Sequence, residues 1–238
     1  MIPIRDLHSQ QRGRTPFVTI LLIAANALLF FYELSLGPER LNAFVMASAF
    51  VPARLAEGGL TPADLGPGLQ SGLLSMFLHG GWAHFLGNML FLWIFGDNVE
   101  DRLGHPRFLL FYLAAGYAAT LAHYWAGPGS TIPAIGASGA ISGVLGAYLF
   151  LHPMARIRTL VFLGFFIQVL DIPALVYLPI WFLIQFFSGV VSLGAETPVE
   201  AGGVAWFAHI GGFVAGPLLL FLLGGWRRPA RASVERGW

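Results

Sequence analysis

Four uncharged polar side chains lie within long apolar runs, and their types are those that acyl-transfer chemistry uses. His84 and Asn88 are four residues apart, so they share one face of a helix. Ser138 lies near the start of another apolar run, and His209 lies inside a third. A serine beside a histidine makes a nucleophile with its general base, and further N–H groups can stabilise an oxyanion. We therefore take these four residues as the candidate site.

The composition predicts that the elements carrying these residues lie in a membrane. Of the 238 residues, 56% are hydrophobic and 11% are charged, whereas a soluble domain usually carries about a quarter charged residues. An ordinary water-soluble fold is therefore disfavoured, and the 14% aromatic content argues against disorder. The absence of cysteine excludes disulfides and thiolate metal sites, and a net charge of +1 gives no reason to expect a nucleic-acid partner.

The apolar runs predict an all-α polytopic membrane protein, a bundle of six transmembrane helices. The expected spans are Phe17–Leu34, Trp82–Val99, Phe108–Tyr124, Ala137–Leu151, Ala174–Val191 and Gly203–Leu223. A further run, Thr159–Leu170, has 12 residues, which is short for crossing about 30 Å at 1.5 Å per residue. We expect this run to be an interfacial segment.

The arginines orient the predicted spans. All 13 basic residues are arginine, and six spans place 11 of them on one side. Because cytoplasmic loops carry the basic excess, we expect both termini to be cytoplasmic. The expected organisation is an N-terminal tail over 1–16, a six-span domain over 17–225 and a C-terminal tail over 226–238. The long outer loop, 35–81, is expected to lie partly in the membrane interface.

Topology brings the candidate residues to one level. The second, fourth and sixth spans run in the same direction, so residues early in each lie at similar depth. Small residues on the fourth and sixth spans would let these two helices approach closely; they are Gly136, Gly139, Gly143, Gly212 and Gly216. Because neither span contains an acidic residue that could orient the histidine, we favour a Ser138–His209 dyad over a triad.

Each candidate also has a structural explanation. A serine in a transmembrane helix commonly bonds its own backbone, and a single membrane histidine serves packing about as often as function. His79 and His84 are five residues apart and no HExxH motif is present, so a zinc site is disfavoured. The functional interpretation gains weight because three spans converge at one depth.

These motifs together resemble the rhomboid family of intramembrane serine proteases. His79-x4-His84-x3-Asn88 is similar to the family pattern in its second helix, and Gly136-Ala137-Ser138-Gly139 is similar to its GxSG motif. Ala208-His209, followed by Gly212 and Gly216, is similar to its sixth-helix motif. The resemblance runs from the first span to about Leu223.

The resemblance implies a six-helix, rhomboid-like core with a water-filled cavity. It implies that Ser138 is the nucleophile, that His209 is the general base, and that His84, Asn88 and the Ser138 N–H bind the oxyanion. Many members carry an aromatic residue four positions after the nucleophile, stacked on the histidine, where this chain has Ser142. In the family the fifth helix and the following loop are implicated in substrate entry, which would place these residues near a gate: Trp181, Phe182, Phe186, Phe187 and Trp206.

We therefore predict a serine endopeptidase that cleaves membrane-anchored proteins within or near their transmembrane segments. Its expected partners are transmembrane substrates and the lipid bilayer, with no metal, cofactor or nucleic acid, and its expected location is a bacterial plasma membrane. Two alternatives remain. A non-catalytic rhomboid-like binder of membrane clients would keep the fold without needing the dyad, and a channel or transporter would need a polar path through the full depth.

Overall fold

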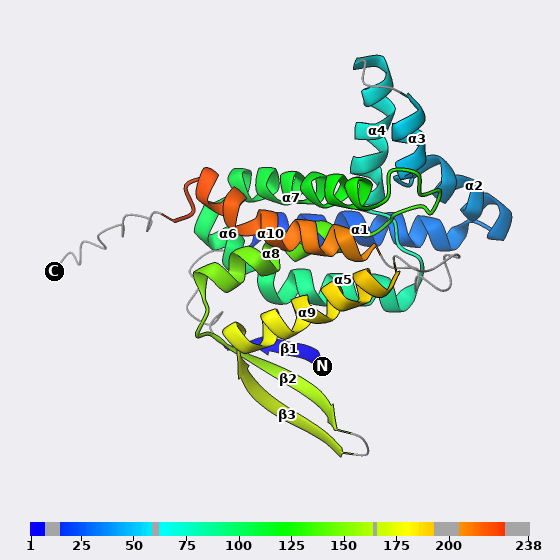
Figure 1. Ribbon diagram of the computed structural model, residues 1–238. Coiled ribbons are helices and arrows are strands. Elements are labelled where there is room, and N and C mark those ends of the chain that lie inside the picture. The colour runs from blue at the N-terminus through cyan, green and yellow to red at the C-terminus, as the bar shows by residue number, and fades with distance from the viewer. Residues whose placement is uncertain (8–14, 59–61, 164–165, 193–204, 227–238) are drawn as a thin grey trace.

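The computed structural model describes residues 1–7, 15–58, 62–163, 166–192 and 205–226. The described chain is mostly helical, with a small antiparallel sheet at one side (Figure 1). Its elements are β1 (Ile2–Asp6), α1 (Phe17–Ser35), α2 (Pro38–Ser48), α3 (Pro52–Gly58), α4 (Pro62–Ser75), α5 (Trp82–Phe91), η2 (Leu92–Gly96), α6 (Asp97–Leu103), α7 (His105–Ala126), α8 (Ser138–Leu151), β2 (Arg156–Leu163), β3 (Phe166–Pro173), α9 (Ala174–Ser192) and α10 (Trp206–Leu222).

In the described residues, helices lie in each of the six segments that the sequence predicts to span a membrane. The second is interrupted by η2, a π-helical turn between α5 and α6. Among the described residues, α1 alone is both long and apolar enough to cross a membrane, while α8, residues 174–188 of α9, and α10 are apolar but shorter. The presence of a helix does not decide whether it crosses the bilayer, so six spans stay a prediction.

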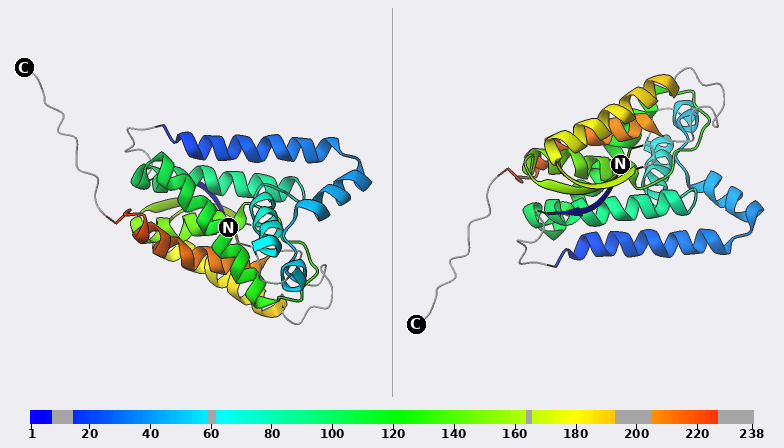
Figure 2. Two further views of the ribbon diagram at one scale, coloured as in Figure 1. Left: turned by 90° about the horizontal axis from the view of Figure 1, so that it is seen from above. Right: turned by 90° about the horizontal axis from the view of Figure 1, so that it is seen from below.

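The helix α8 forms the centre of the molecule. Every residue from Gly139 to Tyr148 is buried, and α7, α9 and α10 pack around this helix. Figure 2 shows α1 at one edge of the bundle and α9 at the opposite edge. The first residue of α8 is Ser138, so the packing of the central helix sets the position of the candidate nucleophile.

The described residues of the long connection 35–81 form three helices, of which α4 projects across the main helix direction (Figure 1). This connection supports the loop that precedes α8. The Gly136 N–H donates to the Ser75 carbonyl at 2.8 Å, and Phe50 and Ala134 form an isolated β-bridge. The backbone immediately before Ser138 is therefore held by α4 and by the α2–α3 connection.

The fold contains a β-sheet, whereas the sequence predicted an all-α protein. Within the run expected to be an interfacial segment, residues 159–163 lie in β2 and residues 166–170 lie in β3. These strands pair antiparallel, and β1 pairs with β2 to complete a three-stranded sheet. The two strands are rich in β-branched and aromatic residues, which favour extended backbone. Hydrophobicity alone does not distinguish a short apolar strand from an apolar helical segment, so these strands were not expected. The interfacial location of the run stays a prediction.

A buried carboxylate joins α1 to α6. Glu100, 2% exposed, accepts hydrogen bonds from the Val18 and Thr19 N–H groups at 2.8 Å and from the Thr19 hydroxyl at 2.6 Å. Its other close contact is His105 Nδ1, at 2.6 Å. The first N–H groups of a helix have no acceptor within that helix. Glu100 supplies those acceptors and fixes the start of α1 against the bundle.

Candidate active site

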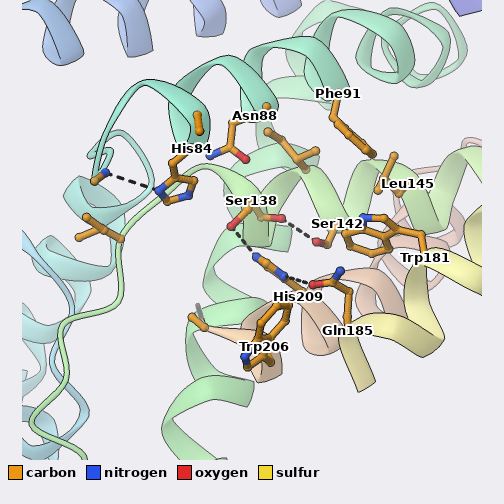
Figure 3. Close-up of a pocket in the computed structure, with 16 residues that line it drawn as sticks. His84, Asn88, Phe91, Ser138, Ser142, Leu145, Trp181, Gln185, Trp206 and His209 are labelled. Atoms are coloured by element: carbon orange, nitrogen blue, oxygen red, sulfur yellow. Dashed lines mark hydrogen bonds between the residues drawn. The ribbon is translucent and has the colours of Figure 1, made fainter. Parts of the chain in front are cut away.

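Ser138 and His209 lie within hydrogen-bond distance of each other, although 71 residues separate them in the chain. The Ser138 Oγ and the His209 Nε2 are 2.7 Å apart. The serine begins α8 and the histidine lies in the first turn of α10. Figure 3 shows the two side chains pointing toward each other at the wall of a cavity.

Glycine contacts between α8 and α10 bring the two residues together. A Cβ built on Gly212 would collide with the Gly139 carbonyl, and one on Gly216 would collide with the Gly143 carbonyl. Gly143 also lies against Ala115 of α7. Because these positions lack side chains, the helix backbones touch along the turns that follow Ser138 and His209.

Gly136 lies in the loop before α8 and does not contribute to the helix contact. Its φ of +121° is rarely available to a residue with a side chain. A Cβ there would stand 2.6 Å from the His84 Nε2. The glycine therefore lets the chain turn into α8 while the imidazole of His84 packs against the backbone.

His84 and Asn88 of α5 line the same cavity as Ser138 and His209. The Gly80 N–H donates to His84 Nδ1 over a long 3.5 Å, which favours the tautomer with its proton on Nε2. The buried Asn88 Nδ2 has no hydrogen-bond partner among the described residues. Both groups are therefore N–H donors on the side of the cavity that faces Ser138 (Figure 3).

The cavity has a volume of about 480 Å³. Its lining is largely apolar beyond the polar groups already named, and includes Phe91, Ile141, Leu145, Trp181 and Trp206. Of the residues expected near a gate, Trp181 and Trp206 line this space. Phe182 packs on Phe213 instead, and Phe186 and Phe187 are exposed.

One polar contact at the site was missed in the sequence. Gln185 of α9 is 9% exposed, and its Oε1 lies 2.7 Å from His209 Nδ1. The sequence does indicate Gln185 as a candidate, because it is an uncharged polar residue inside an apolar run, as are the four predicted site residues. The two acidic residues of the loop before α10, Glu196 and Glu200, lie outside the described residues.

Ser142 makes a local contact with the nucleophile's own backbone. Its hydroxyl donates to the Ser138 carbonyl at 2.6 Å. An aromatic ring of another helix, α9, lies beside His209. The Trp181 ring is centred 6.1 Å from the imidazole with 34° between the planes, and Trp206 meets the imidazole edge-on at 6.1 Å.

A family model, the Rhomboid domain, matches residues 69–226 of this chain. The chain belongs to the rhomboid family. It is therefore a membrane protein. Proteases of this family are serine proteases that act by intramembrane proteolysis, and the family also has inactive members. The matched region includes α5, α8, α9 and α10, and therefore all the cavity residues described above.

Individual rhomboid relatives cover part of the chain. It is 38% identical over 145 residues to the rhomboid protease GluP of Bacillus subtilis, covering 59% of this chain and 25% of that protein. It is 31% identical over 148 residues to the mitochondrial rhomboid protein 1 of Saccharomyces cerevisiae, covering 60% and 39%. The human mitochondrial presenilin-associated rhomboid-like protein is 36% identical over 96 residues, covering 40% and 25%. The matches thus span a quarter to two-fifths of these relatives, which come from bacteria and mitochondria.

Proposed function

We propose that this chain is an intramembrane serine endopeptidase in which Ser138 is the nucleophile and His209 is the general base. The observation that carries the proposal is the 2.7 Å contact between Ser138 Oγ and His209 Nε2 at the wall of a cavity. A serine hydroxyl is a weak nucleophile at neutral pH unless an adjacent base takes its proton as it attacks. His209 is the base within reach of that proton.

The reaction begins when Ser138 Oγ forms a bond to the carbonyl carbon of the substrate. Its proton passes to His209 Nε2, and the π-electron pair of the carbonyl moves to oxygen. As the intermediate collapses, the C–N bond breaks, and the leaving nitrogen takes the proton from His209, leaving an acyl-enzyme. Water then attacks the ester, gives its proton to His209 and releases the acid, while the proton on His209 returns to Ser138.

The negative charge of the intermediate needs N–H donors. His84, Asn88 and the Ser138 N–H would supply them. Ser138 is the first residue of α8, so its N–H has no acceptor within the helix and the partial positive charge of the helix N-terminus is directed at the site. The unpartnered Asn88 Nδ2 supports the same role. Removing one such donor typically lowers kcat by about 10²–10³-fold.

The substrate class follows from the apolar surroundings of the site. Membrane-anchored proteins would present their chain from within or near a transmembrane segment. A helix hides its carbonyls in its own hydrogen bonds, so the segment must unwind locally before it is attacked. We further propose six membrane spans with both termini cytoplasmic, and a bacterial plasma membrane as the location.

The test is covalent labelling of purified protein with a fluorophosphonate, which reacts with activated serines. We expect labelling of the wild type and none of Ser138→Ala or His209→Ala. The matched control is Ser35→Ala, which removes an exposed hydroxyl that bonds only the Tyr32 carbonyl and should label like wild type.

Two outcomes would overturn the proposal. Folded wild-type protein that takes no label would favour the alternative, a non-catalytic rhomboid-like binder of membrane clients. Labelling that persists in Ser138→Ala would show that another residue is the nucleophile. Cleavage of a membrane-anchored reporter by wild type, and not by Ser138→Ala, then distinguishes a protease from a hydrolase of small esters.

A further inference from the structure

His209 is held at both ring nitrogens by groups from two different helices. Nε2 faces Ser138 of α8, and Nδ1 faces Gln185 of α9, each contact being 2.7 Å long. We propose that Gln185 is a positioning residue, which keeps His209 in the one tautomer that can accept the serine proton. The inference rests on the proposed function, since it assigns a role relative to that reaction.

The number of protons on the imidazole determines what each of its ring nitrogens can do. A neutral imidazole carries one N–H and one bare nitrogen, and only the bare nitrogen can accept a proton. The Gln185 atom facing Nδ1 is the carbonyl oxygen Oε1, which accepts a hydrogen bond and cannot donate one. The proton must therefore be on Nδ1, which leaves the Nε2 lone pair directed at Ser138 Oγ.

The same contact serves the charged intermediate. When Nε2 takes the serine proton, the ring becomes an imidazolium with two N–H groups. Nδ1–H keeps its bond to Oε1, so the amide dipole stabilises the positive charge without a second ion. A carboxylate would stabilise it more strongly, but keeping an ionised group in an apolar setting is costly. A neutral amide therefore suits this position among the membrane helices.

α9 holds the imidazole with a second side chain. Trp181 precedes Gln185 by four residues, so both lie on one face of the helix. The indole of Trp181 lies beside the imidazole, with 34° between the two ring planes, while Gln185 Oε1 contacts Nδ1 (Figure 3). Position 142 of α8, where many family members carry an aromatic residue, is a serine in this chain. The orientation of His209 is therefore determined from α9.

The experiment compares Gln185→Leu with wild type by labelling rate and by cleavage of a membrane-anchored reporter, both measured across pH. Leucine has a similar volume and no acceptor, so the ring can rotate or change tautomer. We expect kcat to fall at least about tenfold with KM within about twofold, since misplacing a catalytic group slows the chemical step. Gln168→Leu makes the same change on the exposed face of β3 and should behave like wild type.

Two further variants separate orientation from folding. Gln185→Asn keeps an amide but is one methylene too short to reach Nδ1, and should lose activity like the leucine variant. Gln185→Glu keeps an acceptor and should retain activity, with the acidic limb of its pH profile moved to higher pH, because a carboxylate favours the protonated ring. The other nearby titratable groups, His84 of α5 and His123 of α7, are unchanged in every variant.

A spectroscopic readout reports the tautomer directly. In ¹⁵N-histidine-labelled protein, the His209 signal, assigned by its loss in His209→Ala, should show the proton on Nδ1 in wild type and in Gln168→Leu. In Gln185→Leu we expect a mixture of tautomers. A purely structural role for Gln185 would lower the thermal midpoint without changing the tautomer or the pH profile.

The outcomes distinguish this inference from the proposed function. If wild type labels, Ser138→Ala does not, and Gln185→Leu labels at the wild-type rate at every pH, then the dyad stands and the positioning role is wrong. If His209 carries its proton on Nε2 in wild type, the positioning role is also wrong. If wild type does not label at all, the proposed function itself fails.

Discussion

Gly212 of α10 lies directly against the carbonyl oxygen of Gly139 of α8, so that no Cβ can stand between them. The contact recurs one turn along, between Gly216 and Gly143. The candidate nucleophile and base are each within a turn of this seam. Their separation is thus set by backbone atoms, which do not change rotamer, and less by long side chains.

Substituting this seam should destabilise the fold. Gly212→Ala must force α8 and α10 apart, and we expect it to lower the free energy of unfolding by about 1–3 kcal/mol, as overpacked cores do. The labelling rate of the folded fraction should fall as well. Gly66→Ala in α4 meets nothing within 4 Å and should be neutral or slightly stabilising. Equal thermal midpoints for Gly212→Ala and Gly66→Ala would contradict the contact.

Removing the indole that lies beside the imidazole should slow the reaction. Trp181→Ala frees one face of His209, and we expect kcat to fall about tenfold, since a displaced catalytic group loses its attack geometry. Ser142→Phe in that background returns an aromatic ring from α8 to the same cavity and should recover part of the loss. Reporter cleavage by the two single variants and the double variant measures the coupling. Strictly additive effects would show that the two positions act independently.

Asn88 should matter to the reaction and little to binding. Asn88→Ala removes a buried donor that has no partner in the described structure, and we expect kcat to fall about 10²-fold with KM nearly unchanged. Asn42→Ala, on the exposed surface of α2, provides the control in the same reporter assay. A loss confined to KM would instead assign Asn88 to substrate binding.

Glu100 should matter to stability. Glu100→Ala leaves two backbone N–H groups and the Thr19 hydroxyl without the acceptor that they share. We expect a loss of about 3 kcal/mol in the free energy of unfolding, because unsatisfied buried donors are costly. Glu100→Gln keeps an oxygen acceptor and should lose less. Reversible unfolding in a mixed micelle measures both, and equal stability of the alanine variant and wild type would contradict the role.

The strand pair β2–β3, called the hairpin below, contains an ion pair between Arg158 and Asp171. The effect of this pair on stability changes with pH in a definite direction. Hydrogen bonds from Arg158, at 2.8 and 3.0 Å, hold the pKa of Asp171 below its ordinary value. The pair therefore supports the hairpin at neutral pH, and this support is lost as the pH falls through the lowered pKa. Arg158→Gln should return the pKa of Asp171 toward the ordinary carboxyl range. A carbon-detected titration of Asp171 checks this, and an unchanged pKa would refute the pairing.

The sequence predicted the helices, and it predicted that four side chains lie close together: Ser138, His209, His84 and Asn88. It did not predict the Gln185 contact or the sheet. Each apolar run and its direction can be determined without knowing which segments touch. These two features therefore located the helices and predicted that the four residues lie at one depth. The catalytic roles of these residues stay predictions. Whether each helix crosses a membrane is not decided by helix formation.

The features that were missed depend on contacts between distant segments. The pairing of Ile2 with Leu160 leaves no trace in either segment alone, so the sheet was not expected. The contact of Gln185 with His209 depends on how α9 packs on α10. A glutamine inside an apolar run could have been flagged, but its partner could not be identified from spacing.

A proline inside α9 bears on how the molecule responds to warming. Pro173 ends the preceding strand, and Pro179 lies inside the helix, where it removes a backbone N–H from the hydrogen-bond ladder. The central helix α8 contains no proline and is buried from Gly139 to Tyr148, so we expect amide hydrogens of α9 to exchange with solvent before those of α8. Heat should then release His209 from Gln185 while α8 is still folded. Inactivation would precede melting, and on cooling activity would return without any refolding of the core.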